Sequence, residues 1–96
     1  MTVFVVAQLS IFDRESYGRY EATFMDIFQK YQGQLLAVDE VPKVLEGEWT
    51  NTRIVIASFP DADAFNAWFQ SPEYVELAKH RKAGSKGPIL LVQGLS

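Results

Sequence analysis

The sequence predicts an α+β fold in which one antiparallel sheet carries helices on a single face. Three observations predict it: the order of the elements, the short chain and strands that are apolar on both sides. A strand (Thr2–Ile11) precedes a long amphipathic helix (Arg14–Tyr31), two strands and two short helices follow, and a last strand covers Pro88–Gly94. All of this fits into 96 residues, the size of one domain spanning residues 1–96. The βαββαβ order is that of a split βαβ, ferredoxin-like sandwich with a four-stranded sheet.

The first strand is apolar on both of its faces. Its odd-numbered positions from Val3 to Ile11 are all apolar, and Phe4 and Val6 add apolar side chains to the opposite face. The helices can cover only one face of the sheet, so the other face needs a cover of its own. A domain this small also leaves much apolar surface near water. We therefore expect a homodimer that forms through the open face.

The first helix is predicted from its start signal and its periodicity. Asp13 is a good N-cap and Glu15 favours the positive end of the helix. Aromatic and aliphatic residues then recur at spacings of three and four, and they form one stripe: Tyr17, Tyr20, Phe24, Ile27, Phe28 and Tyr31. We expect this stripe to lie in the core, and we expect Gly33 to be a left-handed C-terminal cap.

The two central strands are expected on either side of a long connection. The first begins at Gln34–Val38, is bent or placed at a sheet edge by Pro42, and resumes at Val44–Glu46. Residues Gly47–Thr52 are predicted to turn the chain, and Arg53–Phe59 is the next strand.

Two short helices follow, each with a recognisable start. Asp61 can cap the first of them, which carries several aromatic residues on one face. Ser71–Glu73 starts the second with a capping hydroxyl, a proline at the first helical position and an acid. We expect this helix to end near Lys82, before Gly84.

Composition narrows the classes of function. The net charge of −3 and the pI near 5 leave no basic face for a phosphate backbone, so nucleic acid is not an expected partner. The chain has no cysteine, which excludes thiol chemistry and cysteine-based metal sites. Neither a signal peptide nor a membrane-spanning stretch is recognisable, and a cytoplasmic protein is expected.

Several short motifs resemble one family along nearly the whole chain. They are Ala7–Gln8 before Asp13, Tyr17 and Tyr20, Leu45–Gly47 followed by Trp49, Arg53–Ile56 leading to Phe59–Pro60, and Trp68 followed by Ser71–Tyr74 and Arg81. In these motifs the chain resembles the domain-of-unknown-function 1330 family of the dimeric α+β barrel superfamily. The resemblance implies a ferredoxin-like subunit whose sheet packs on the sheet of its twin. It implies no particular reaction, because that superfamily includes small oxygenases, haem proteins and stress-response proteins.

Two arginines are the main candidates for ligand binding. Arg81 lies on the apolar stripe of its helix, where a guanidinium needs an anion or water. It can form an internal ion pair, with Glu46 for example, reach the rim, or anchor the carboxylate of a ligand. Arg53 and Glu46 flank the predicted turn, where they can form a cross-strand ion pair or stand at the mouth of a cleft.

Three further aromatic residues and one histidine allow two readings each. Trp68 and Tyr74 flank the joint between the short helices, where they can line a pocket or fill the core. Trp49 is either a lid or a dimer contact. His80, the only histidine, is expected to be a solvated residue on a basic last turn rather than a base or ligand.

The sequence supports two hypotheses of function. The first is a pocket for a small aromatic or carboxylate-bearing molecule, lined by Glu46, Arg53, Trp68, Tyr74 and Arg81. If this pocket is catalytic, we expect cofactor-independent proton transfer or oxygenation, as in an oxygenase or isomerase. The second is a non-catalytic binding or assembly module. No phosphate loop, nucleophile elbow or metal-ligand cluster is visible in the sequence, so no cofactor and no metal are expected.

Overall fold

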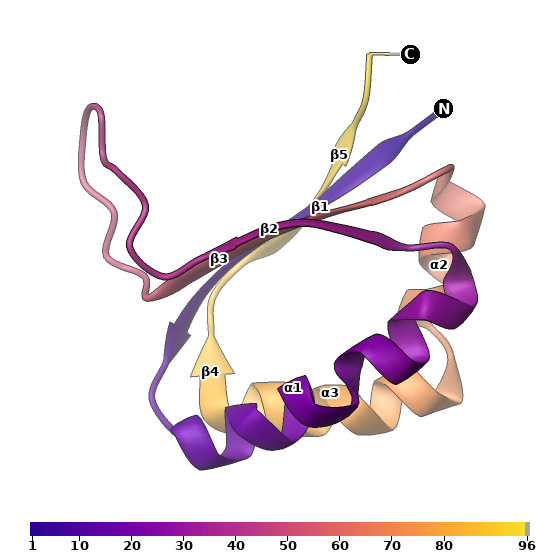
Figure 1. Ribbon diagram of the computed structural model, residues 1–96, viewed down its shortest axis with the longest axis horizontal. Helices are drawn as coiled ribbons and strands as arrows, with labels where there is room; N and C mark the ends of the chain where they lie inside the picture. Colours follow the sequence, from indigo (N-terminus) through magenta and orange to yellow (C-terminus); the bar gives the residue numbers. More distant parts are fainter. Residues whose placement is uncertain (96) are drawn as a thin grey trace.

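The computed structural model describes residues 1–95, which form a sheet layer and a helix layer (Figure 1). The elements in chain order are β1 (Val3–Ile11), α1 (Arg14–Phe28) with a 3₁₀ turn (Gln29–Tyr31), β2 (Gln34–Asp39), β3 (Arg53–Phe59), α2 (Ala62–Phe69), α3 (Pro72–Gly84), β4 (Ser85–Lys86) and β5 (Ile89–Gln93). The predicted βαββαβ order is confirmed, with the last strand divided into two pieces.

The sheet is antiparallel, with β1 at its centre. Its order is β2-β3-β1, and β4 and β5 both pair with the remaining edge of β1. Val5 of β1 pairs with Ala57 of β3 and with Leu91 of β5. Because side chains alternate along a strand, the odd-numbered residues of β1 face the helices, and those from Val3 to Leu9 are buried. All three helices lie on this one side of the sheet (Figure 1).

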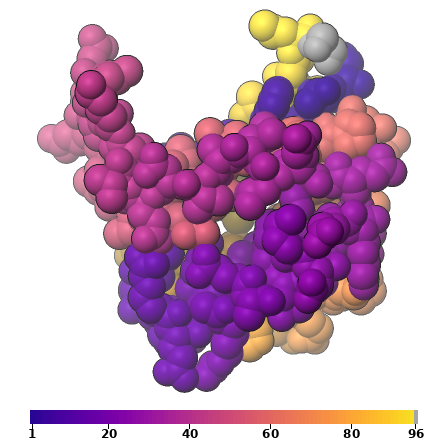
Figure 2. All heavy atoms as spheres, viewed as in Figure 1, coloured from indigo at the N-terminus to yellow at the C-terminus, as the bar shows by residue number. Residues whose placement is uncertain are grey.

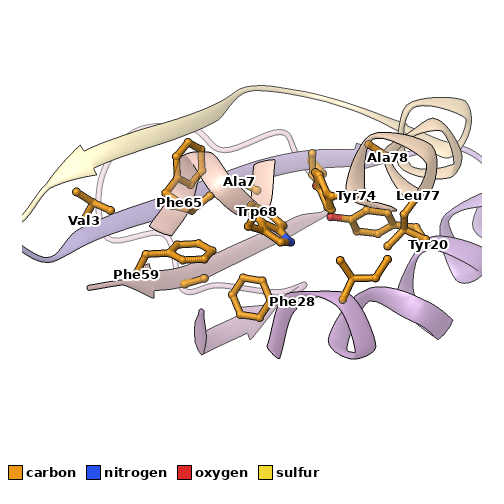
Figure 3. Close-up of a cluster of buried hydrophobic side chains, with 14 of the residues drawn as sticks. Val3, Ala7, Tyr20, Phe28, Phe59, Phe65, Trp68, Tyr74, Leu77 and Ala78 are labelled. Carbon is orange, nitrogen blue, oxygen red and sulfur yellow. The ribbon is translucent and has the colours of Figure 1, made fainter. Parts of the chain in front are cut away.

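The core between the two layers is mainly aromatic. Phe28, Phe59, Trp68 and Tyr74 are each no more than 3% exposed, and their rings pack edge to face or tilted (Figure 3). The centroids of Trp68 and Tyr74 are only 4.1 Å apart. The predicted aromatic stripe of α1 therefore does lie in the core, where Tyr17 is also buried. Buried aromatic pairs of this kind add about 0.5–1.5 kcal/mol each beyond the burial of their area.

The three predicted helix starts are confirmed by their capping hydrogen bonds. The Asp13 carboxylate accepts from the backbone N–H groups of Glu15 and Ser16. The Asp61 carboxylate accepts from the N–H of Ala64 at 2.8 Å. In α3 the Ser71 hydroxyl accepts from the N–H of Tyr74 at 3.1 Å.

The end of α1 differs from the prediction. Gln32, with φ = 68°, takes the left-handed position that was expected at Gly33. The reason is the 3₁₀ turn, which tightens the end of the helix and moves the reversal forward by one residue. Gly33 is needed for a different reason, since a Cβ there would lie 2.4 Å from Cζ of Phe28.

The connection between β2 and β3 also differs from the prediction. Strand β2 ends at Asp39, and Val44–Glu46 forms no ladder with another strand. Residues 40–52, called the arm below, project from the sheet on the side away from the helices (Figure 1). The turn is confirmed at Gly47, whose φ is 80°. Pro42 and the absence of a pairing strand explain why the extended pattern around Val44 makes no sheet.

Near the C-terminal end, α3 continues to Gly84, two residues beyond the predicted Lys82. Strand β4 follows it directly, and Gly87 and Pro88 then separate β4 from β5. Gly87 has φ = 143°, and a Cβ there would collide with the carbonyl oxygen of Gln8. This close approach divides the last strand, because only glycine allows the two backbones to come so near.

Candidate functional site

A cavity of about 180 Å³ lies between the inner face of the sheet and the helices α1 and α3. The surface is hollowed between β2 and α1, as Figure 2 shows. The lining of the cavity is mostly apolar and aromatic: Val5, Ala7, Leu9, Tyr17, Tyr20, Phe24, Met25, Phe28, Leu35, Val38, Val55, Ala57, Trp68, Tyr74 and Ile89. Three charged residues complete it: Glu21, Arg53 and Arg81.

Arg81 has no partner for its charge among residues 1–95. The ion pairs within residues 1–95 do not include it, and its Nε is buried without a hydrogen-bond acceptor. The guanidinium carbon lies 6.0 Å from the centroid of the Tyr20 ring. The predicted pairing with Glu46 is wrong, because Glu46 is an exposed residue of the arm, outside the cavity lining. An unpaired guanidinium beside aromatic rings favours an anion that comes from outside the chain.

Arg53, by contrast, is neutralised by two carboxylates. Its Nη2 lies 2.8 Å from Glu21 and its Nη1 lies 3.1 Å from Glu40, while its guanidinium stacks on the ring of Tyr17 at 5.4 Å. Glu46 was predicted as the partner here too, and this is wrong. Strand β2 ends where Asp39 pairs with Ile54, so the next residue, Glu40, is the one that reaches Arg53.

The same carboxylate links the sheet to the start of α1. Glu40 accepts from Arg14 at 2.9 Å as well as from Arg53, so Arg14, Glu40, Arg53 and Glu21 form a charge network beside the opening. The hydrogen bonds from Arg14 and Arg53 lower the pKa of Glu40 below its ordinary value of 4.5. This network has two charges of each sign, so it does not attract an anion by itself.

Two buried tyrosines form the polar centre of the aromatic wall. The hydroxyls of Tyr20 and Tyr74 are 2.7 Å apart (Figure 3). Burial raises the pKa of Tyr20 well above 10.0, so the phenol keeps its proton. One tyrosine donates to the other, and the second hydroxyl proton is left for another acceptor.

All the buried side-chain polar atoms without a partner in residues 1–95 belong to residues of this lining. They are Nε of Arg53, Nε1 of Trp68 and Nε of Arg81. Each of them is an N–H donor. A buried donor without an acceptor costs about 1–3 kcal/mol. The surrounding side chains shield these three atoms, so a molecule in the cavity would reach them only if those side chains moved.

Four of the five predicted binding residues therefore meet around one cavity: Arg53, Trp68, Tyr74 and Arg81. The sequence interpretation missed Glu21, Tyr17 and Tyr20 as lining residues. A signal for Glu21 was present, since it follows Tyr17 by four positions and precedes Phe24 by three, which places it on the same helical stripe.

The other residues singled out from the sequence lie elsewhere. Trp49 is half-buried in the arm and does not line the cavity, and His80 is exposed on α3. Within the described part of the chain, no three His, Cys, Asp or Glu side chains are grouped so that they could hold a metal ion. None of the helices in residues 1–95 has the length and apolarity that crossing a bilayer requires.

The order of the elements and an antiparallel sheet with helices on one face define a ferredoxin-like α+β fold. Within this class the chain belongs to the family described as domain of unknown function (DUF1330), whose model matches residues 2–95. The resemblance read from the sequence motifs is thereby confirmed. No functionally curated protein matches the chain.

Solved structures with the same fold have low sequence identity to this chain. RPA0582, a protein of unknown function from Rhodopseudomonas palustris, has a TM-score of 0.83 at 18% identity, with 99% of this chain and 83% of that chain covered. SnoaB, a cofactor-independent oxygenase from Streptomyces nogalater, has a TM-score of 0.71 at 18% identity, covering 99% and 94%. A dimeric ferredoxin-like protein of unknown function from Jannaschia sp. CCS1 has a TM-score of 0.68 at 16% identity, covering 96% of each chain.

Proposed function

We propose that the cavity binds a small aromatic molecule with one carboxylate, anchored by Arg81. The observation that carries this proposal is the charge of Arg81, which has no ion-pair partner within residues 1–95 and lies on a lining that is mostly apolar and aromatic. A carboxylate supplies several acceptor lone pairs and the opposite charge. The aromatic walls suit a flat ring, which can lie against Phe24, Phe28 and Trp68.

The size of the cavity supports a ligand with a single ring. An engineered apolar cavity of about 150 Å³ in another protein binds benzene. A cavity of about 180 Å³ is therefore suited to one six-membered ring with a small substituent. Fused polycyclic molecules would need the two layers to move apart.

The charges of the lining support a ligand with one negative charge. Arg53 is already paired with Glu21 and Glu40, which leaves Arg81 as the cation for the ligand. A second negative charge would come near the carboxylate of Glu21, which also lines the cavity. We therefore expect a monoanion to bind better than a dicarboxylate or a phosphate ester.

Thermal unfolding with benzoate, benzamide and phthalate as probes tests this proposal. A ligand at ten times its Kd stabilises the native state by about 1.4 kcal/mol, which raises the Tm of a small protein by several degrees. We expect benzoate to raise the Tm, and benzamide and phthalate to raise it less.

An Arg81→Met variant keeps most of the side-chain length without the charge, and we expect it to lose the benzoate effect. Lys82→Met is the matched control, since Lys82 is exposed on the same helix. An equal response to benzoate in both variants would refute Arg81 as the anchor. Equal responses to benzoate and benzamide in the wild-type protein would refute the anionic ligand.

The lining supports binding more directly than catalysis. Its only carboxylate is that of Glu21, which is in an ion pair with Arg53. The tyrosine pair supplies no base at neutral pH, because burial raises the pKa of Tyr20 and the phenol keeps its proton. The second candidate is a cofactor-independent activity, either that of an oxygenase, as SnoaB is described, or that of an isomerase. Oxygen uptake with a bound aromatic acid, absent in Arg81→Met, would favour it.

We also propose that the protein is a homodimer formed through the outer face of the sheet. One of the proteins with this fold is described as dimeric. The register places six apolar side chains on the outer face: Phe4, Val6, Ile54, Ile56, Leu90 and Val92. They are half-buried or exposed in the single chain, and Leu90 and Val92 are more than 40% exposed. Sedimentation velocity at micromolar concentration tests this proposal, and a monomer would refute it.

A further inference from the structure

We infer that the arm, residues 40–52, grips a second copy of this chain, and that Val41, Val44 and Leu45 contact the partner. The inference rests on the homodimer proposed above and adds to it the element that secures the contact. It follows from where the arm stands, how it is held and what it exposes.

The arm rises from one end of the sheet on the side without helices (Figures 1 and 2). The start of β1 and the end of β5 rise from the other end of the sheet on this same side (Figure 1). The open face of the sheet therefore lies in a saddle between the arm and these two strand ends. A body seated on this face would have the arm beside it.

The base of the arm is held firmly, while the rest of it touches little. At the base, the Ser10 hydroxyl donates to Asn51 at 2.9 Å and the N–H of Thr52 donates to the Leu9 carbonyl at 2.8 Å. Glu40 is fixed at the other end by Arg14 and Arg53. Between these anchors, none of the hydrogen bonds and ion pairs found within residues 1–95 involves residues 42–50. The position of the arm is thus set at its base, and its outer part is left free for an external contact.

The arm exposes three large apolar side chains among charged ones. Val41 is 86% exposed, Leu45 is 81% exposed and Val44 is 49% exposed. These three residues lie within five positions of one segment, and they are called the apolar patch below. A patch of this kind on a projecting segment marks a protein contact. Pro42 stiffens the segment beside the patch, which reduces the entropy lost when the arm is ordered.

A second copy is the partner that these features fit. The patch stands next to the outer face of the sheet, so one partner can cover both. Four strands about 4.8 Å apart and about five residues long give a flat footprint of only about 300 Å², whereas a stable interface buries about 800 Å² on each partner. In a two-fold dimer each arm packs against the other chain, so the interface contains two equivalent arm contacts. Trp49 then belongs to the dimer contact and not to a lid, in keeping with its absence from the cavity lining.

The oligomeric state of an arm variant tests the inference. In Val41→Ser/Val44→Ser/Leu45→Ser the patch is polar while the base of the arm is intact. We expect its dimer dissociation constant to rise about tenfold or more. Val75→Ser is the matched control, since Val75 is 50% exposed on α3, away from the sheet face. We expect its dissociation constant to stay within about twofold of that of the wild-type protein. Circular dichroism checks that both variants are folded.

The outcomes separate this inference from the proposed dimer. A dimeric wild-type protein with an unchanged dissociation constant in the arm variant would overturn the role of the arm and leave the dimer standing. A monomeric wild-type protein would overturn both the proposed dimer and the role of the arm in it. The same holds if a different protein, and not a second copy, binds between the arm and the other end of the sheet.

A labelled arm gives a second and direct readout. The chain has no cysteine, so Leu45→Cys provides a single thiol for an environment-sensitive fluorophore. We expect its emission to shift to the red on dilution, with the same midpoint as dimer dissociation measured by sedimentation. The same label at Val75→Cys should show no shift. An emission at position 45 that does not change while the dimer dissociates would contradict the inference.

Discussion

At the scale of single residues, two arginines that look alike in sequence have opposite roles. Both line the cavity. The charge of Arg53 is balanced by ion pairs with Glu21 and Glu40, whereas Arg81 forms no ion pair with a carboxylate within residues 1–95. The difference depends on which carboxylates the fold brings near. Arg53 links the sheet to α1 through Glu21, whereas Arg81 is the arginine to which we assign the proposed ligand.

The tyrosine pair allows a prediction about buried hydrogen bonds. Tyr74→Phe leaves the Tyr20 hydroxyl buried without its partner, and we expect a loss of about 1–3 kcal/mol in the free energy of unfolding. Tyr20→Phe should cost a similar amount. The double variant should cost clearly less than the sum, because it leaves no orphaned hydroxyl. Urea denaturation of the four proteins measures this coupling, and strictly additive losses would show that the pair is not coupled.

At the scale of elements, the joint between α2 and α3 positions three residues of the cavity lining. Ser71 is the N-cap of α3, and its hydroxyl also donates to the Trp68 carbonyl at 2.8 Å. One side chain thus fixes Trp68 at the end of α2 and Tyr74 in the first turn of α3. Arg81 follows Tyr74 by two helical turns, so its position also depends on where α3 starts.

The cap of α3 should therefore matter for both stability and binding. We expect Ser71→Ala to lower the free energy of unfolding by about 1–2 kcal/mol. The N–H of Tyr74 loses its acceptor, and the Trp68 carbonyl loses the hydrogen bond from the Ser71 hydroxyl. Thr50→Ala, at an exposed position of the arm, is the control and should change it by less than about 0.5 kcal/mol. Chemical denaturation measures both variants. Equal stabilities would contradict a structural role for this cap.

At the scale of the whole molecule, a few charges and a large aromatic core hold the two layers together. The Arg14–Glu40–Arg53–Glu21 network crosses from the sheet to α1 on one side of the cavity. Within the helix layer, Lys30 of the 3₁₀ turn pairs with Glu73 of α3 at 2.8 Å. These pairs are largely exposed and contribute modestly. Their effect is to fix the spacing of the layers beside an opening that the core does not fill.

The charge network predicts a dependence of stability on pH. The folded-state pKa of Glu40 is lowered below 4.5, so its contribution is present above the unfolded-state value and is lost as pH falls through the folded-state value. We expect Glu40→Gln to be less stable than the wild-type protein at pH 7, with the difference shrinking as the pH falls below about 4. Denaturation in urea from pH 3 to pH 7 measures this. Glu48→Gln in the arm, which has no ion pair within residues 1–95, should follow the wild-type curve. A difference for Glu40→Gln that stays constant over this range would contradict the assignment.

The fold could be predicted almost completely because its signals are local. Capping residues such as Asp13, Asp61 and Ser71 act within one turn, and strands were recognisable by their alternation. The errors fall where distant backbone decides the outcome. Gly87 divides the last strand because of the Gln8 carbonyl, and Val44–Glu46 forms no strand because no neighbour is there to pair with it.

The sequence by itself determined the order of the elements, the aromatic face of α1 and the candidate residues Arg53, Trp68, Tyr74 and Arg81, because these depend on spacing along the chain. Only the tertiary structure decided how charges pair, since Glu46 and Glu40 look equally suitable in sequence and only Glu40 stands beside Arg53. The tertiary structure also decided that Arg53, Trp68, Tyr74 and Arg81 line one cavity. It further decided that the arm lies beside the open face of the sheet. The physical reason is range: helix periodicity and capping act over a few residues, whereas an ion pair or a cavity depends on segments that folding alone brings together.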